Sequence, residues 1–197
     1  MVLVGVLIES RDIPKLKNIG VKDSKLLSPK KREIIFKDIL KIIRKYKIVI
    51  VNPVEIDQAL NSDNLNLNRL EAIKSAIIIN YLNPDKVVLD CPSNNIRYYT
   101  NYLKLFIKNK NVEIDAGHDY DKKFLAVGAA SILAKVTRDA QIKRIQFKIK
   151  ENFGSGYPSD PYTKKFLKEN FDKYPEIFRK TWSTYRKIAN QKKLEEF

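Results

Sequence analysis

Apolar residues along the chain fall either into short unbroken runs or into longer stretches with helical spacing. Runs rich in β-branched residues predict buried strands at 1–9 and 86–90 and a short strand at 47–51, and the stretch NVEIDA predicts another strand at 111–116. The longer stretches have apolar positions three and four residues apart, which is typical of helices with one buried face. They predict helices at 28–47, 54–60, 68–82, 96–108, 124–151, 162–171 and 180–193.

Strands that alternate with helices predict an α/β fold, in which helices cover a sheet. No strand pattern follows the glycine-rich stretch at 154–156, so residues 154–197 are expected to form a helical extension to a domain over 1–153. The long helix predicted at 124–151 carries the small residues GAAS at 128–131, which would let it lie close to a sheet. No run of about 18 apolar residues is present, so we expect no membrane span.

The charge of the chain narrows the choice of partner. Lys and Arg total 38 and Asp and Glu total 23, which gives a net charge of +15. This excess favours a polyanionic partner, nucleic acid before an anionic membrane surface, although a lysine-rich composition can also serve only to solvate the surface. The basic residues Lys164, Arg179 and Lys180 would suit phosphate contacts, or they form a solvated helical face.

Cysteine and histidine counts restrict the metal chemistry. Cys91 is the only cysteine, which excludes an internal disulfide and a cysteine zinc site and indicates a reducing, cytoplasmic compartment. A single histidine excludes a multi-histidine site, so any metal would be held by carboxylates, as Mg²⁺ and Mn²⁺ are. Asp90, at the carboxyl end of a predicted strand, and the cluster of Asp115, Asp119 and Asp121 are candidate ligands. Their structural alternatives are a helix cap and a solvated acidic loop.

Tyr157 lies in the turn-rich stretch GSGYPSDP at 154–161. An exposed tyrosine in such a loop can stack on a sugar or a base of nucleic acid. The alternative is a ring that packs beneath the loop while the prolines set its turns. The sequence leaves both interpretations open.

Four stretches together resemble archaeal-type ribonuclease HII. They are IGVKDSKLLSPKKRE at 19–33, VVLDC at 87–91, AASILAKVTRD at 129–139 and GSGYPSDPYTKKFL at 154–167, of which the last two are the most specific. The resemblance covers nearly the whole chain. It implies a ribonuclease H-like mixed sheet flanked by helices, with a C-terminal helical extension. It also implies a monomeric endonuclease that cuts the RNA strand of RNA–DNA hybrids and cuts beside single ribonucleotides in duplex DNA, leaving 5′-phosphate and 3′-hydroxyl ends.

The resemblance assigns roles to individual residues. Asp90 matches the third of four family carboxylates and Asp121 the fourth, and the four together hold two divalent ions. Tyr157 matches the tyrosine that senses the RNA–DNA junction. Lys135 and Arg138 resemble positions that are structural or contact the nucleic-acid backbone. A sliding clamp of the PCNA kind is a candidate partner, for which the terminal KKLEEF offers an exposed hydrophobic end.

The first strand of the family has no counterpart in this sequence. That strand carries the stretch DEAGRG with the first two carboxylates, and Met1 aligns just beyond it. Without it, we expect a gap in the sheet between the runs at 1–9 and 86–90, at a cost that typical stabilities of about 5–15 kcal/mol do not absorb.

Two explanations for this gap compete. Either the start is assigned too far downstream, or the chain is a diverged, non-catalytic relative that still binds hybrid nucleic acid. The intact downstream motifs favour the first. A third hypothesis, a basic scaffold for other proteins, predicts no salt-dependent affinity for nucleic acid.

Overall fold

The computed structural model describes residues 1–21 and 27–195, except the side chains of 192–195. The chain divides into two compact units. The strand unit comprises residues 2–50 and 67–137, and the helical unit comprises Met1 with residues 51–66 and 138–197.

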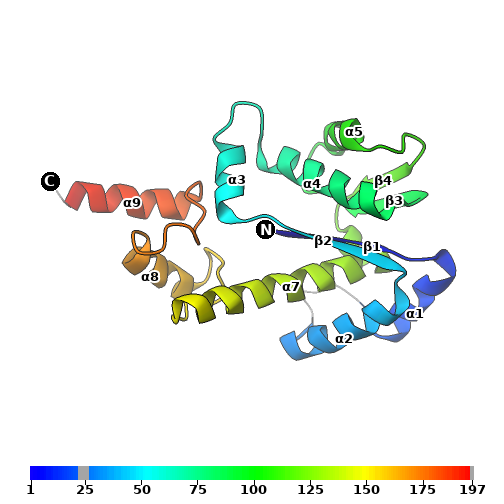
Figure 1. Ribbon diagram of the computed structural model, residues 1–197, viewed down its shortest axis with the longest axis horizontal. Helices are drawn as coiled ribbons and strands as arrows, with labels where there is room; N and C mark the ends of the chain where they lie inside the picture. Colours follow the sequence, from blue (N-terminus) through cyan, green and yellow to red (C-terminus); the bar gives the residue numbers. More distant parts are fainter. Residues whose placement is uncertain (22–26, 196–197) are drawn as a thin grey trace. The chain divides into compact units, whose positions relative to one another are not determined.

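The strand unit holds every strand among the described residues, and helices cover these strands (Figure 1). The strands are β1 (Val2–Leu7), β2 (Lys45–Ile50), β3 (Lys86–Asp90) and β4 (Glu113–Gly117). The helices are a 3₁₀ turn (Ser10–Asp12), α1 (Ile13–Asn18), α2 (Pro29–Ile42), α4 (Leu67–Leu82), α5 (Ile96–Phe106), α6 (Tyr120–Lys123) and the first half of α7 (Leu125–Ile149).

The four strands form two separate pairs rather than one sheet. β1 runs antiparallel to β2, with Val4 opposite Ile48. β3 runs parallel to β4, with Val88 opposite Asp115. Across the described residues, no strand pairing joins β1 to β3. Each pair therefore has two outer edges that lack a neighbouring strand among the described residues, and the outer edges of β1 and β3 are two of these four.

Two apolar clusters hold the helices against these strand pairs. The first packs β1 against α1, α2 and α7, and its fully buried members include Leu16, Ile35, Ile39, Ile132 and Leu133. The second packs α4 and α5 against β3, around Ala72, Ala76, Val87, Tyr99 and Leu103. α4 also covers β1, where Gly5 lies so close to Ile78 and Leu82 that a side chain at position 5 would collide with them. Helix α4 therefore packs against both strand pairs and holds them together.

The helical unit is built around aromatic residues. Its helices are α3 (Pro53–Leu60), the second half of α7, α8 (Pro161–Asn170) and α9 (Ser183–Glu195). Phe153, Phe166 and Phe178 form its buried cluster with Leu167. Asp57 in α3 accepts hydrogen bonds from the backbone N–H groups of residues 180 and 181 and so ties α3 to the segment between α8 and α9.

The predicted strands and helices are present, most of them with ends within three residues of the prediction, and three helices differ further. The helix predicted at 28–47 ends at Ile42, because the backbone N–H of Arg44 donates to the carbonyl of Leu7 and the chain joins β1 at that point. Helices α1 and α6 were not predicted, since both are too short to show a period.

No helix among the described residues is long and apolar enough to cross a bilayer.

Candidate active site

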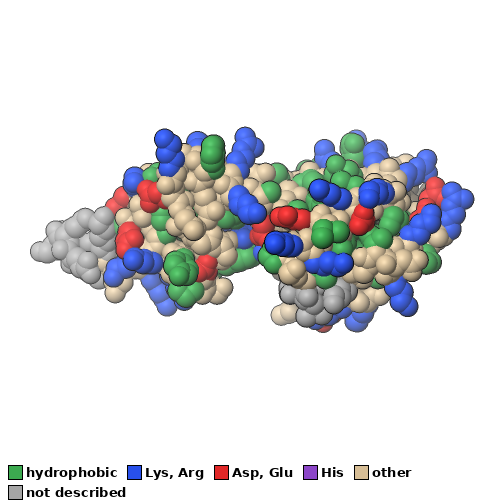
Figure 2. Space-filling model, turned by 90° about the horizontal axis from the view of Figure 1, so that it is seen from below, with side chains coloured by type: hydrophobic (Ala, Val, Ile, Leu, Met, Phe, Trp, Pro, Cys, Tyr) green, Lys and Arg blue, Asp and Glu red, His purple; other side chains and the backbone are tan. Residues whose placement is uncertain are grey.

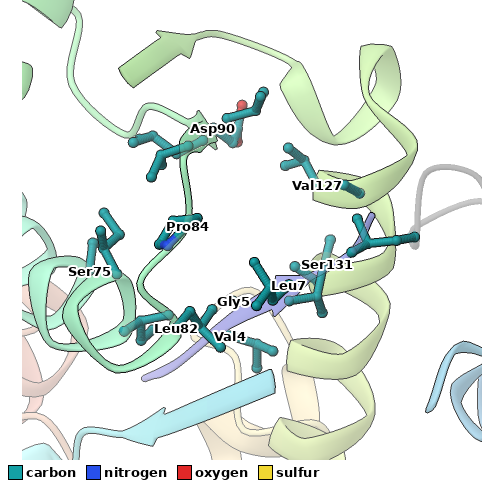
Figure 3. Close-up of a pocket in the computed structure, with 18 of the residues that line it drawn as sticks. Val4, Gly5, Leu7, Ser75, Leu82, Pro84, Asp90, Val127 and Ser131 are labelled. Atoms are coloured by element: carbon teal, nitrogen blue, oxygen red, sulfur yellow. The ribbon is translucent and has the colours of Figure 1, made fainter. Parts of the chain in front are cut away.

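A groove of about 580 Å³ separates β1 from β3 in the strand unit (Figure 3). α4 contributes Ser75 and Leu82 to its wall, and α7 contributes Val127 and Ser131. The groove lies where the sequence predicts a gap, between the apolar runs at 1–9 and 86–90, so that prediction is confirmed.

The edge of β1 at this groove presents unpaired backbone groups. The amino group of Met1 donates to the carbonyl of Val51, and the N–H of Val51 donates to the carbonyl of Met1, at 2.6 and 2.8 Å. Such mutually bonded pairs alternate along an antiparallel ladder. The backbone groups of Val2, Val4 and Val6 therefore point away from β2, toward the other edge of β1.

The edge of β3 has the same character. The carbonyl of Asp85 accepts the N–H of Glu113, and the N–H of Cys91 donates to the carbonyl of Gly117. In this parallel register the odd-numbered residues of β3 bond to β4, so the backbone groups of Val88 and Asp90 point toward the groove. Two strand edges therefore border one space.

The side chains of β1 are half-exposed as a consequence. An unbroken apolar strand such as VLVGVL is typical of positions buried on both faces of a sheet. All six residues are only partly buried here, although α2, α4 and α7 pack against the strand. The surface of these residues that stays exposed faces the groove, which all six residues line.

The two predicted metal ligands both line this groove. Asp90 is the last residue of β3, and Asp121 lies in the short helix α6. Oδ1 of Asp90 accepts the backbone N–H of Tyr120 at 3.0 Å, which ties the end of β3 to α6. The carboxyl ends of strands are the edge at which open α/β sheets bind their ligands. The structure therefore places both carboxylates where chemistry is expected.

The neighbouring acids have other partners. Asp115 accepts the hydroxyl hydrogen bond of Tyr120 at 2.8 Å, and this bond raises the pKa of the Tyr120 phenol. Asp119 pairs with Lys122 at 2.5 Å and precedes α6 in a left-handed conformation, with φ 60°. No group of three His, Cys, Asp or Glu side chains among the described residues could hold a metal ion. Asp90 and Asp121 share the groove, and their role as metal ligands stays a prediction.

The tyrosine loop, residues 153–163, belongs to the helical unit. Tyr157 is 43% exposed, so its ring stands out of the loop rather than packing beneath it. The guanidinium of Arg138 lies over this ring, 3.8 Å from its centre. The structure thus brings together two residues that the sequence analysis assigned separately to the substrate.

The remaining predicted substrate residues are dispersed. Lys164 is exposed on α8, and Lys180 is exposed between α8 and α9. Arg179 is half-buried, with its guanidinium over the ring of Trp182. Lys135 is half-buried on α7. Lys and Arg side chains are spread widely over the face seen in Figure 2.

Sequence reasoning missed several residues that shape these sites. The contacts of Tyr120 with Asp90 and Asp115 have no pattern in the sequence, because they depend on the short helix α6. The bond from the N–H of Ser155 to Asp160 depends on the path of the loop in the same way. A glycine inside an apolar strand, such as Gly5, is a signal of close approach that could have been used.

Known proteins resemble this chain over most of its length. A sequence profile described as Ribonuclease HII matches residues 1–185. The chain is 40% identical to the ribonuclease HII of Pyrococcus horikoshii, over 99% of this chain and 91% of that protein. It is 41% identical to the ribonuclease HII of Pyrococcus furiosus, over 99% of this chain and 87% of that protein. The chain belongs to the ribonuclease HII family.

Solved structures agree with this assignment. The ribonuclease H2 from Pyrococcus horikoshii OT3 has a TM-score of 0.83 at 36% identity, covering 97% of this chain and 98% of that chain. The ribonuclease HII solved with PCNA from Archaeoglobus fulgidus has a TM-score of 0.81 at 32% identity, covering 100% and 92%. Bst-RNase HIII in complex with Mn²⁺ shares the fold at 13% identity, with a TM-score of 0.78 and coverage of 98% and 65%. The predicted ribonuclease H-like α/β fold with a helical C-terminal region is confirmed.

Proposed function

We propose that this ribonuclease HII family member is a metal-dependent endonuclease acting on RNA–DNA hybrids and on single ribonucleotides in duplex DNA. The observation that carries the proposal is the position of Asp90 and Asp121, both on the groove between β1 and β3. The family relatives are ribonucleases HII, and a structure with the same fold was solved with Mn²⁺. Mg²⁺ and Mn²⁺ both prefer carboxylate oxygens of this kind.

Two carboxylates alone are too few for two divalent ions, because four positive charges would face two negative ones. We infer that a β-strand in the groove supplies further acids. Such a strand would pair with the free edges of β1 and β3 and would bury the half-exposed side chains of β1. The resemblance implies the same strand, with the stretch DEAGRG and two carboxylates.

The chemistry then divides between the metal and the chain. A bound divalent ion supplies an activated water and neutralises charge on the phosphate. Asp90 and Asp121 would hold it, and the N–H of Tyr120 keeps the carboxylate of Asp90 in one orientation. The products would carry 5′-phosphate and 3′-hydroxyl ends. The 2′-hydroxyl is the group that distinguishes RNA from DNA at the cut.

Residues 154–197 would serve substrate binding. Tyr157 offers an exposed ring to the sugar at the RNA–DNA junction, and Lys164 and Lys180 are exposed for phosphate contacts. A sliding clamp is the proposed protein partner, since the relative from Archaeoglobus fulgidus was solved with PCNA. The clamp contact is predicted from the tail KKLEEF at 192–197. The structure does not describe the side chains of this tail.

A non-catalytic protein that binds hybrid is the second candidate. It is favoured by one observation, namely that no third metal-ligating side chain joins Asp90 and Asp121 in the described part of the chain. This alternative predicts salt-dependent binding without cleavage, whatever strand fills the groove.

Substitution of single acids tests the proposal. The strand-completed chain, defined as residues 1–197 preceded by a segment with the DEAGRG strand, should nick a duplex with one ribonucleotide in Mn²⁺. Asp90→Asn and Asp121→Asn should each lower the rate on the order of a hundredfold or more. Asp119→Asn is the matched control and should retain the rate, because Asp119 does not line the groove. Equal rates in all three variants would contradict the assignment.

A further inference from the structure

The tyrosine loop has a backbone that is held at many points. The carboxylate of Asp160 accepts the N–H groups of Ser155 and Tyr162, at 2.6 and 3.0 Å. The hydroxyl of Thr163 accepts the N–H of Gly156 at 3.0 Å and donates to the carbonyl of Phe153 at 2.8 Å. These bonds hold the backbone both before and after position 157. The loop therefore offers a fixed backbone from which the ring of Tyr157 projects.

The ring itself is supported by Arg138 in α7. The guanidinium carbon lies 3.8 Å from the ring centre, a distance typical of a close cation–π stack. Gly156 makes this approach possible. It has φ +72°, and a Cβ there would come within 3.1 Å of Nη2 of Arg138 and 2.8 Å of Cδ1 of Ile142.

The surroundings of Arg138 do not suit a direct phosphate contact. Its side chain is 19% exposed, and Nη1 lies 3.3 Å from the carboxylate of Asp139. The ring of Tyr157 covers the guanidinium further. Lysines that are free to reach a phosphate, such as Lys164, lie exposed instead.

We propose that Arg138 is a positioning residue, which stacks on one face of the Tyr157 ring and holds the other face toward the sugar at the RNA–DNA junction. This inference rests on the proposed role of Tyr157. A planar guanidinium can stack on a ring, whereas the ammonium of lysine is a point charge on a flexible stem. Arg138→Lys therefore keeps the charge and removes the support.

Binding measurements on residues 1–197 test the inference. Anisotropy titrations compare a duplex with one ribonucleotide against the same duplex in all-DNA form. Arg138→Lys should lower the preference for the ribonucleotide roughly two- to tenfold, the range of a cation–π contact. Arg138→Ala, which removes the charge, should leave the salt slope unchanged, because a residue that only supports the ring neutralises no phosphate. Arg144→Lys, an exposed arginine on the same helix, is the control and should change neither quantity. Arg138→Lys combined with Tyr157→Ala should be no worse than Tyr157→Ala alone.

Spectra of tyrosine labelled with ¹³C give a readout without any ligand. The ring signals of Tyr157, assigned with Tyr157→Phe, should move in Arg138→Lys and stay in Arg144→Lys.

The outcomes separate the two hypotheses. If Tyr157→Ala abolishes the preference while Arg138→Lys preserves it and the ring signals, the positioning role is wrong and the proposed function stands. If Arg138→Ala, which removes the charge, lowers the salt slope by about one, Arg138 contacts a phosphate and the positioning role is again wrong. If the wild-type chain shows no preference, or Tyr157→Ala leaves it intact, the junction role of Tyr157 fails and the inference fails with it.

Discussion

Carboxylates in this chain differ in the backbone groups that surround them. Oδ1 of Asp90 accepts one N–H, from Tyr120. Asp160 accepts the N–H groups of Ser155 and Tyr162, and these bonds, first the one from Ser155, lower its pKa to about 2. Asp160 is the N-cap of α8, where it accepts the N–H of Tyr162 and Pro161 follows at the first helical position. No pattern in the sequence predicted its contact with Ser155.

Asp160→Asn should lower the stability of the fold by an amount that depends on pH. Because the folded pKa lies below the ordinary value of 3.8, the charged form stabilises the fold above pH 3.8, and that contribution is lost as pH falls toward about 2. Thermal unfolding followed by circular dichroism should therefore show a gap between wild type and Asp160→Asn that narrows between pH 3.8 and about 2. Asp63→Asn, at an exposed position of the same unit, should show no such narrowing. A gap that stays constant with pH would contradict the account.

Strands and helices were predicted to different degrees along the chain. Apolar runs rich in β-branched residues predict three of the described strands, and the fourth, β4, was predicted from the stretch NVEIDA at 111–116, where Val112 and Ile114 alternate with polar residues. The long helix α7 was predicted within two residues at each end. The end of α2 was not, because Ile42 and the residues after it continue the helical pattern, and a tertiary hydrogen bond from Arg44 to β1 decides where the helix stops.

The packing of α4 on β1 depends on a glycine. A Cβ at Gly5 would overlap Cγ2 of Ile78 and lie 3.1 Å from Cδ1 of Leu82. Gly5→Ala should therefore lower the free energy of unfolding by about 1–3 kcal/mol, the usual cost of overpacking. Urea unfolding measures this. In a double-mutant cycle, Ile78→Ala should relieve part of the loss, because it removes the atom that the new Cβ meets. Strictly additive losses would show that the two positions do not clash.

Charge and the divided sheet are the features of the whole molecule that bear on function. The net charge of +15 was available from composition alone, as was the reduced choice of metal ligands. The groove between β1 and β3 was predicted only through the family resemblance, since no pattern within 1–197 marks an absent neighbour. The boundary between the strand unit and the helical unit falls at Thr137–Arg138, inside the continuous helix α7. The sequence does not indicate this boundary, because the apolar stripe of α7 continues through it.

Binding to an RNA–DNA hybrid should depend strongly on salt. Each phosphate that the protein neutralises contributes about −0.9 to the slope of log affinity against log salt concentration for a duplex. Anisotropy titrations from 50 to 200 mM salt should therefore give a steep straight line. Lys164→Ala should reduce the slope by about one, whereas Lys86→Ala should not, because Lys86 is paired with Glu113. A flat line would favour a protein-binding scaffold over any nucleic-acid function.

The central claim is that Asp90 and Asp121 form half of a metal site, and that a strand between β1 and β3 supplies the other half. The most direct test is Mn²⁺-dependent nicking of a duplex with one ribonucleotide, by residues 1–197 and by the strand-completed chain. We expect little or no nicking by residues 1–197, because two carboxylates cannot place two divalent ions for an in-line displacement. The strand-completed chain should be active, and the same chain with the two acids of DEAGRG changed to amides should be folded but inactive. Full nicking by residues 1–197 alone would contradict the account, and would mean that other acids, such as Asp119 or Glu9, complete the site.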